Sequence, residues 1–183
     1  DLVRTTPALP LSCHWDDDVL LLCAIARPAE PRLATRYRID LAPGLLTQQG
    51  KAIPAQVLHA ETERPALNAY VEAWDDGIPR FSVVGNMAMS VADIQAVLRV
   101  RIGERDVPYA IERRQQYRYQ GGGHRFEVRL AGDVGVDTRV HLHVLPGLRS
   151  EVGELRGTQD ATLLSAHGNE SFRVRQVSCR QRD

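Results

Sequence analysis

The sequence lacks both net charge and long apolar runs, and each absence excludes a class of function. Its 183 residues carry 23 basic and 23 acidic side chains, so no overall field draws the protein toward nucleic acid or an anionic membrane. No stretch approaches the roughly 18–20 apolar residues that cross a bilayer. We therefore expect no nucleic-acid partner and no transmembrane segment in this chain.

Aromatic residues and lysine are also scarce. Aromatic residues make up 5% of the chain, and Lys51 is the single lysine. With 43% apolar residues, the sequence predicts a modest core of leucine, valine, isoleucine and alanine. The chain starts at Asp1, which indicates either a processed mature protein or a fragment of a longer polypeptide.

Cysteine occurs three times, as Cys13, Cys23 and Cys179. The first two flank the acidic triplet Asp16–Asp18, which is typical of a hairpin turn. A disulfide across this hairpin would close a loop of about eleven residues and stabilise it by roughly 2–3 kcal/mol. Two buried reduced thiols are the alternative. A zinc site is not expected, because His14 is the nearest ligand candidate and the sequence has no second cysteine pair.

One segment of the sequence occurs twice. Thr35–Leu45, followed by Gly50, returns 103 positions later as Thr138–Leu148, followed by Gly153. Short solenoid repeats have periods of roughly 20–50 residues, so this offset is too long for them. It is close to the size of one small all-β domain, and it predicts two copies of such a domain in tandem.

Alternation of apolar and polar residues predicts strands along most of the chain. The ranges with this pattern are 19–25, 35–41, 69–74, 80–84, 97–102, 107–111, 125–130, 139–144 and 172–177. One short helix is predicted over Ser90–Leu98, with Ser90 as N-cap and Asp93 three residues later. The fold class expected is all-β, with tandem Ig-like or macroglobulin-like antiparallel β-sandwiches and at most one short helix.

The repeat also divides the chain into modules. A proline among polar residues in Glu63–Asn68 predicts the boundary there. We expect a first Ig-like module over 1–66, a second over 67–170, and the start of a further module or a C-terminal tail over 171–183. The first copy is short by several strands, so it is either truncated at its N-terminus or a reduced variant of the domain.

The repeated unit resembles a known family. Ala34–Leu45 resembles a strand and Pro-Gly-Leu turn of the N-terminal domains of bacterial alpha-2-macroglobulins, and Val57–Pro65 resembles the strand and proline-containing linker that follow. Arg80–Asn86 resembles the opening strand of such modules. The resemblance implies scaffold modules, without a catalytic role, of a periplasmic or cell-envelope protein that entraps or inhibits proteases. Its implied partners are proteases and other envelope proteins.

The family's internal thioester forms within a Cys-x-x-Gln sequence, and none of the three cysteines here begins one. No trapping chemistry is therefore assigned to any residue of this chain. The rival interpretation from another class is an Ig-like repeat region of a bacterial adhesin or surface protein that binds a protein or glycan ligand. A small hydrolase carrying a β-sandwich is a third hypothesis.

Several residue groups suggest chemistry, but each has a simpler interpretation. His141 and His143 share one strand face and could ligate a metal with His124 or Asp133, yet their counterparts in the first copy are Arg38 and Asp40, which favours a solvated face. Asp16–Asp18 and Asp75–Gly77 could hold calcium but are interpreted as turns, and Gly121–Gly123 could cradle a phosphate but is interpreted as a hairpin tip. Ser165 with His167 lacks the surrounding Gly-x-Ser-x-Gly sequence of a hydrolase nucleophile. Arg113–Tyr119 mixes basic and aromatic residues, as single-strand binders do, but is interpreted as an exposed strand face. We predict no catalytic, cofactor or metal site.

Overall fold

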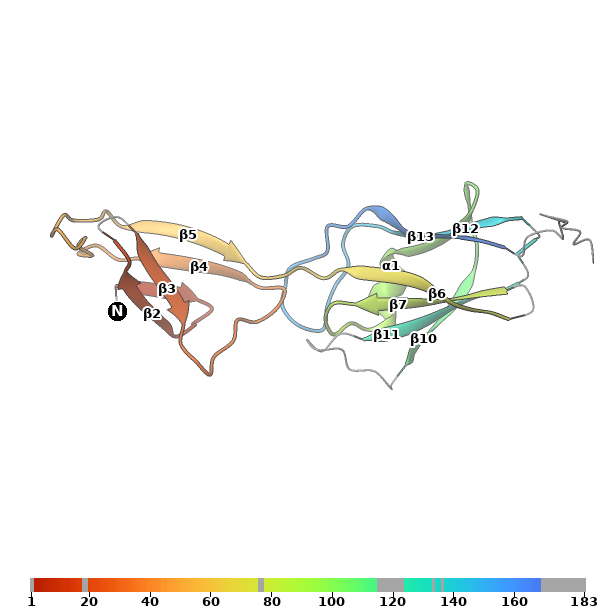
Figure 1. Ribbon diagram of the computed structural model, residues 1–183, viewed down its shortest axis with the longest axis horizontal. Helices are drawn as coiled ribbons and strands as arrows, with labels where there is room; N and C mark the ends of the chain where they lie inside the picture. Colours follow the sequence, from red (N-terminus) through yellow and green to blue (C-terminus); the bar gives the residue numbers. More distant parts are fainter. Residues whose placement is uncertain are drawn as a thin grey trace, which may run out of the picture. The chain divides into compact units, whose positions relative to one another are not determined.

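The computed structural model describes residues 2–17, 20–75, 78–114, 124–132, 134–135 and 137–168. These residues form antiparallel β-sheets with one short helix among them, which confirms the predicted all-β class (Figure 1). The chain divides into two compact units. Unit one comprises Asp1–Pro65 with Arg149–Gly157, and unit two comprises Ala66–Leu148 with Thr158–Asp183.

Unit one contains five strands within its described residues. β1 (Val3–Thr6), β4 (Arg36–Leu41) and β5 (Gln56–Glu61) form a three-stranded sheet in the order β1-β4-β5, while β2 (Leu11–Trp15) and β3 (Leu21–Ile25) form a separate hairpin. The turn of this hairpin begins as predicted from the acidic residues, because Asp17 Oδ1 accepts a hydrogen bond of 2.7 Å from the Leu20 amide. Asp18 lies outside the described residues.

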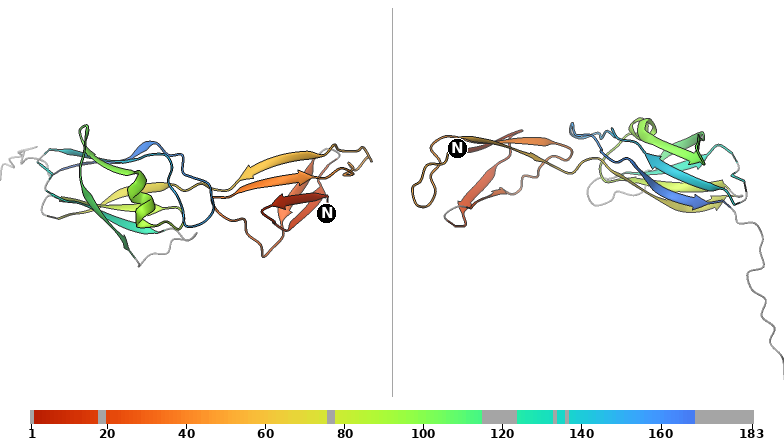
Figure 2. Two further views of the ribbon diagram at one scale, coloured as in Figure 1. Left: turned by 180° about the vertical axis from the view of Figure 1, so that it is seen from behind. Right: turned by 90° about the horizontal axis from the view of Figure 1, so that it is seen from above.

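Unit two is a two-layered sandwich (Figure 2). One sheet has the order β10-β11-β7-β6 and the other β13-β12-β8-β9. Its elements are β6 (Leu67–Asp75), β7 (Ile78–Gly85), α1 (Val91–Val97), β8 (Leu98–Ile102), β9 (Arg105–Asp106), β10 (Tyr109–Arg114), β11 (Arg125–Leu130), β12 (Arg139–Val144) and β13 (Ala161–His167).

The core of unit two follows from the period-two pattern of its strands. Phe126 and Val128 of β11 lie opposite Val83 and Phe81 of β7, and all four side chains are fully buried. From the other sheet, β12 contributes the fully buried residues Val140, Leu142 and Val144. Because successive residues of a strand point to opposite faces, each strand places one apolar row in the interior.

The helix begins where the sequence predicts. Ser90 is the N-cap, and its hydroxyl oxygen accepts a hydrogen bond of 3.1 Å from the Asp93 amide. The buried side chains Ile94 and Val97 anchor α1 to the core. No helix within the described residues is long and apolar enough to cross a membrane.

The repeated sequence adopts a repeated backbone conformation. Gly44 has φ of 97° and its counterpart Gly147 has 105°, while Gly50 and Gly153 have 78° and 72°. These left-handed values explain why glycine stands at both positions in both copies. The residues that open the repeat also match, since Ala34 and Asp137 have φ of 50° and 59°.

The predicted module ranges, 1–66 and 67–170, are contiguous, whereas the segment Arg149–Gly157 groups with unit one. Within that unit, the Leu155 amide donates a hydrogen bond of 2.7 Å to the Ala34 carbonyl. The predicted strand over 172–177, the tail over 171–183 and Cys179 lie outside the described residues.

Candidate functional site

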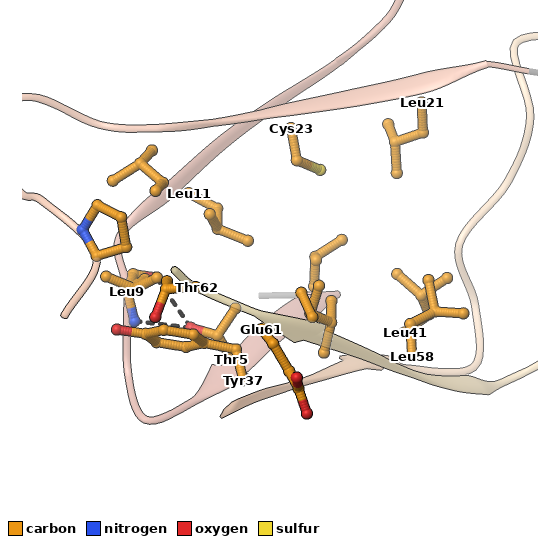
Figure 3. Close-up of a pocket in the computed structure, with 15 residues that line it drawn as sticks. Thr5, Leu9, Leu11, Leu21, Cys23, Tyr37, Leu41, Leu58, Glu61 and Thr62 are labelled. Atoms are coloured by element: carbon orange, nitrogen blue, oxygen red, sulfur yellow. Dashed lines mark hydrogen bonds between the residues drawn. The ribbon is translucent and has the colours of Figure 1, made fainter. Parts of the chain in front are cut away.

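An apolar groove lies between the two sheets of unit one. It has a volume of about 450 Å³. In Figure 3, Leu11, Leu21 and Cys23 of the β2–β3 hairpin lie opposite Tyr37, Leu41 and Leu58 of the larger sheet. The full lining is Val3, Thr5, Leu9, Leu11, Leu21, Cys23, Ile25, Pro31, Tyr37, Ile39, Leu41, Leu58, Ala60, Glu61 and Thr62.

The groove is open because the sheets of unit one leave much of their apolar surface uncovered. Tyr37 is buried, but Ile39 and Leu41 further along β4 are half-buried, and every residue of β5 is exposed. Leu58 retains 47% of its accessible surface. Full burial of such a side chain is worth roughly 1.5–3 kcal/mol, and these residues realise only part of it, so a groove lined this way favours an apolar occupant.

Unit two shows the same strands with their faces covered. The counterparts of Tyr37, Ile39 and Leu41 are Val140, Leu142 and Val144, which are all fully buried. Among the buried apolar side chains of the described residues, only Ala34, Tyr37, Pro65 and Leu155 belong to unit one. β4 and β12 have the same alternation of residues, so their different burial results from the elements that pack on them.

The predicted disulfide forms part of the groove. Cys13 and Cys23 lie directly opposite each other in the β2–β3 hairpin with a Cα–Cα distance of 4.0 Å, and their sulfur atoms are bonded. In unit two the corresponding cross-strand pair is Ile111 with Val128, whose side chains are buried. The disulfide thus links the hairpin at the position where unit two has a packed aliphatic pair.

Polar contacts fix one end of the groove. The Tyr37 hydroxyl accepts a hydrogen bond of 2.9 Å from the Arg32 amide, and the Thr62 hydroxyl donates to the Arg32 carbonyl at 2.8 Å. Beside them, Arg36 and Arg64 bind the two oxygens of Glu61 at 2.7 Å and 2.5 Å. The hydrogen bond from Arg36, followed by that from Arg64, lowers the pKa of Glu61, so this carboxylate stays charged at neutral pH.

The two histidines with metal-ligand spacing contact residues on β13 and just before it. His141 Nδ1 lies 2.7 Å from the Ser165 hydroxyl, and His143 Nε2 lies 3.0 Å from a carboxylate oxygen of Asp160. His124 lies elsewhere, with its Nδ1 beside the backbone of Met89. Within the described residues, no group of three or more His, Cys, Asp or Glu side chains could hold a metal ion. Asp133 is not among those residues.

The residues of a hydrolytic triad are not assembled on β12 and β13. Ser165 contacts His141, whereas the nearby carboxylate, Asp160, contacts His143. His167, the other candidate partner of Ser165, lies 3.2 Å from Arg139 instead. A triad needs the serine and the carboxylate on the two nitrogens of one imidazole, and here they lie on different histidines.

Unit two also contains a buried carboxylate that sequence reasoning missed. Glu127 is 2% exposed and binds both Arg114 and Arg129. Burial raises the pKa of Glu127, but the hydrogen bonds from the two arginines outweigh it and lower the pKa overall. Arg114 lies on β10, and Arg129 lies on β11 with Glu127. This cluster therefore stabilises the pairing of the two strands.

Sequence reasoning also missed the groove, although one signal for it was present. The first copy is short by several strands, and a sandwich short of strands must leave apolar side chains uncovered. The predicted turn over Asp75–Gly77 lies partly outside the described residues, and Gly121–Gly123 lies wholly outside them. Of the basic and aromatic run Arg113–Tyr119, only the first two residues are described.

No protein-family model matches the chain, and no curated protein shows a significant match to it. The resemblance to bacterial alpha-2-macroglobulins therefore rests on the motifs of the sequence alone.

Proposed function

We propose that the two units are scaffold modules of a bacterial alpha-2-macroglobulin-like protein of the cell envelope, where they hold the protease-entrapping parts at set positions. One observation carries the proposal: five strands of each unit pair in the same order, and the pairs β1–β4 and β2–β3 also match β8–β12 and β10–β11 in register. Duplicated sandwiches of this kind act chiefly through spacing and through their surfaces. The repeated Pro-Gly-Leu turn, with its left-handed Gly44 and Gly147, supports the family resemblance.

The contacts of the polar side chains favour a scaffold over an enzyme. His141 contacts Ser165 and His143 contacts Asp160, with Ser165 exposed and both histidines half-buried. Such cross-strand pairs are ordinary stabilising contacts of a sheet.

The disulfide favours a location outside the cytoplasm. Structural disulfides persist in oxidising compartments such as the bacterial periplasm and are rare in reducing ones. The Cys13–Cys23 bond therefore supports a periplasmic or envelope location.

A protease-protection assay tests this function. The polypeptide that contains this chain, purified from the envelope of its source bacterium, is mixed with trypsin in small molar excess. Entrapment predicts that trypsin continues to cleave a small chromogenic peptide but loses activity on casein, because the large substrate no longer reaches the active site. The 183-residue chain alone should leave both activities unchanged, since its role is positional.

Two outcomes would contradict the proposal. Unchanged casein cleavage with the full polypeptide would exclude protease entrapment. Saturable binding of the 183-residue chain alone to an immobilised glycan or host matrix protein would instead favour the adhesin. Cell fractionation adds a second readout, because recovery in the cytoplasm would exclude the envelope location.

A further inference from the structure

Within the described residues, unit one contains the counterparts of five strands of unit two and lacks those of β6, β7 and the two-residue β9. The pairings β1–β4, β2–β3 and β4–β5 of unit one correspond to β8–β12, β10–β11 and β12–β13 of unit two. In unit two, β11 pairs on its other side with β7, and β7 with β6. In unit one, β3 has β2 as its sole strand neighbour among the described residues.

The correspondence extends to single residues. In the β2–β3 hairpin the pairs are Leu11 with Ile25, Cys13 with Cys23 and Trp15 with Leu21. In the β10–β11 hairpin the matching pairs are Tyr109 with Leu130, Ile111 with Val128 and Arg113 with Phe126. The residues Leu21, Cys23 and Ile25 of β3 therefore correspond one by one to Phe126, Val128 and Leu130 of β11.

The outer edge of β3 is able to accept another strand. Backbone hydrogen bonds of 2.9 Å from Ala26 to Pro10 and from Asp16 to Leu20 mark the hydrogen-bonded pairs of the hairpin. Because such pairs alternate in antiparallel strands, the amides of Leu21, Cys23 and Ile25 point away from β2. The sequence of β3, LLCAI, has no charged residue, and charge is a common means of blocking an edge.

We propose that a β-hairpin with the apolar pattern of β6–β7 adds antiparallel to the free edge of β3 and closes the groove of unit one. The hairpin is supplied by the same polypeptide, from residues that precede Val3. This inference is independent of the proposed protease-related function, because it rests on the comparison of the two units alone.

Unit two indicates the chemistry of the inner strand of this hairpin. Phe81 and Val83 of β7 lie opposite Val128 and Phe126 and are fully buried. The equivalent side chains would lie opposite Cys23 and Leu21 and enter the groove. Its volume of about 450 Å³ is that of a ligand pocket, but small-molecule sites also need convergent polar groups. Here the polar groups of Tyr37, Glu61 and Thr62 already bind Arg32, Arg36 and Arg64, so apolar side chains on a strand are the better fit.

Chain order indicates the source of the hairpin. In unit two, β6, β7 and α1 occur in that order directly before β8. The counterpart of β8 is β1, because Val3 and Thr5 pair with β4 as Leu98 and Val100 pair with β12. The same order in unit one places the hairpin directly before Val3.

Site-specific photo-crosslinking identifies the occupant directly. A benzophenone amino acid replaces Ala24 of β3 in the polypeptide as its source cells make it, and the crosslinked peptides are sequenced by mass spectrometry. The expected product is an intrachain crosslink to residues ahead of Val3. The matched control carries the probe at Ser12, which pairs with Ala24 but lies on β2, and it should give no such crosslink. A crosslink from Ala24 to a second copy or to another protein, or none at all, would overturn the proposal.

A fusion tests the chemistry of the hairpin separately. A second copy of residues 66–97 is joined directly to Val3, because Val97 immediately precedes Leu98, the counterpart of Val3. Hydrogen exchange at the amides of Leu21, Cys23 and Ile25 should become about tenfold slower or more than in the unfused chain. Phe81→Asp in the added copy alone should abolish this protection. Equal exchange in the fused and unfused chains would contradict the inference.

Discussion

Replacing Gly153 by alanine should destabilise unit one far more than replacing Gly50, although both glycines occupy the same position of the repeat. Both have left-handed φ, 72° and 78°, so alanine incurs the same backbone cost of roughly 1–2 kcal/mol at each site. Alanine also restricts the unfolded chain, which offsets about 0.4–1 kcal/mol of this. For Gly50→Ala we therefore expect a loss of roughly 1 kcal/mol in the free energy of unfolding.

The surroundings of the two glycines differ. A Cβ at Gly50 meets no atom within 4 Å, whereas one at Gly153 would collide with the backbone carbonyl groups of Leu33 and Ala34. A backbone neighbour cannot rotate away, and overpacking of this kind costs typically 1–3 kcal/mol. A shift there also disturbs the hydrogen bond from Leu155 to Ala34, worth about 1 kcal/mol. We expect Gly153→Ala to cost roughly 2–4 kcal/mol more than Gly50→Ala.

Urea unfolding followed by residue-resolved NMR measures this difference. Amide signals of Tyr37 and Ala60 report on unit one, and those of Phe126 and Leu142 on unit two. Both variants should leave the midpoint of unit two close to that of the parent chain. Equal losses at the two glycines would refute the reasoning, because they would mean that the close approach of Gly153 to Leu33 and Ala34 does not exist in solution.

Three further predictions concern local contacts. The double variant Cys13→Ser/Cys23→Ser should lower the free energy of unfolding of unit one by about 2–3 kcal/mol in urea titrations, with unit two as the internal control; no loss would exclude a stabilising disulfide. The stability of unit two should fall as the pH drops below about 4.5, because the folded pKa of Glu127 is lowered from that value and the stabilising charge is lost through it. In the Glu127→Gln variant the stability of unit two should no longer show this fall with pH. The Glu112→Gln variant, changed at the exposed neighbouring position of β10, should still show it. Ser90→Ala should cost about 1 kcal/mol in thermal unfolding of unit two, and Ser90→Thr, which keeps the hydroxyl that bonds to Asp93, should restore most of it.

Local patterns were enough to predict most strands and the helix. The strand over 36–41 and the strand over 125–130 follow from an alternation that each segment carries by itself. The N-cap at Ser90 requires contacts with residues three positions away at most. The Cys13–Cys23 bond was one of two interpretations of the spacing, and the hairpin register selects it by placing the two residues opposite each other.

Strands with a disturbed pattern were not predicted. β13, over Ala161–His167, has two adjacent half-buried residues, Leu163 and Leu164, at the place where its pairing with β12 shifts between Leu142 and His143. A bulge of this kind breaks the period-two signal. β1 is only four residues long, with Val3 as its sole large apolar residue, so it carries little pattern to detect.

The sequence by itself determined where the chain alternates, where it turns and that one unit is repeated, because these depend on neighbours along the chain. Only the tertiary structure decided which strands pair and which edges stay open. The residues Leu21, Cys23 and Ile25 of β3 and the residues Phe126, Val128 and Leu130 of β11 both have the pattern of a buried strand face. Those of β11, which pairs with β7 at its edge, are buried, whereas those of β3 line a groove. Whether a strand face is buried depends on strands that lie far away in the chain. The alternation within one segment does not show whether such strands are present.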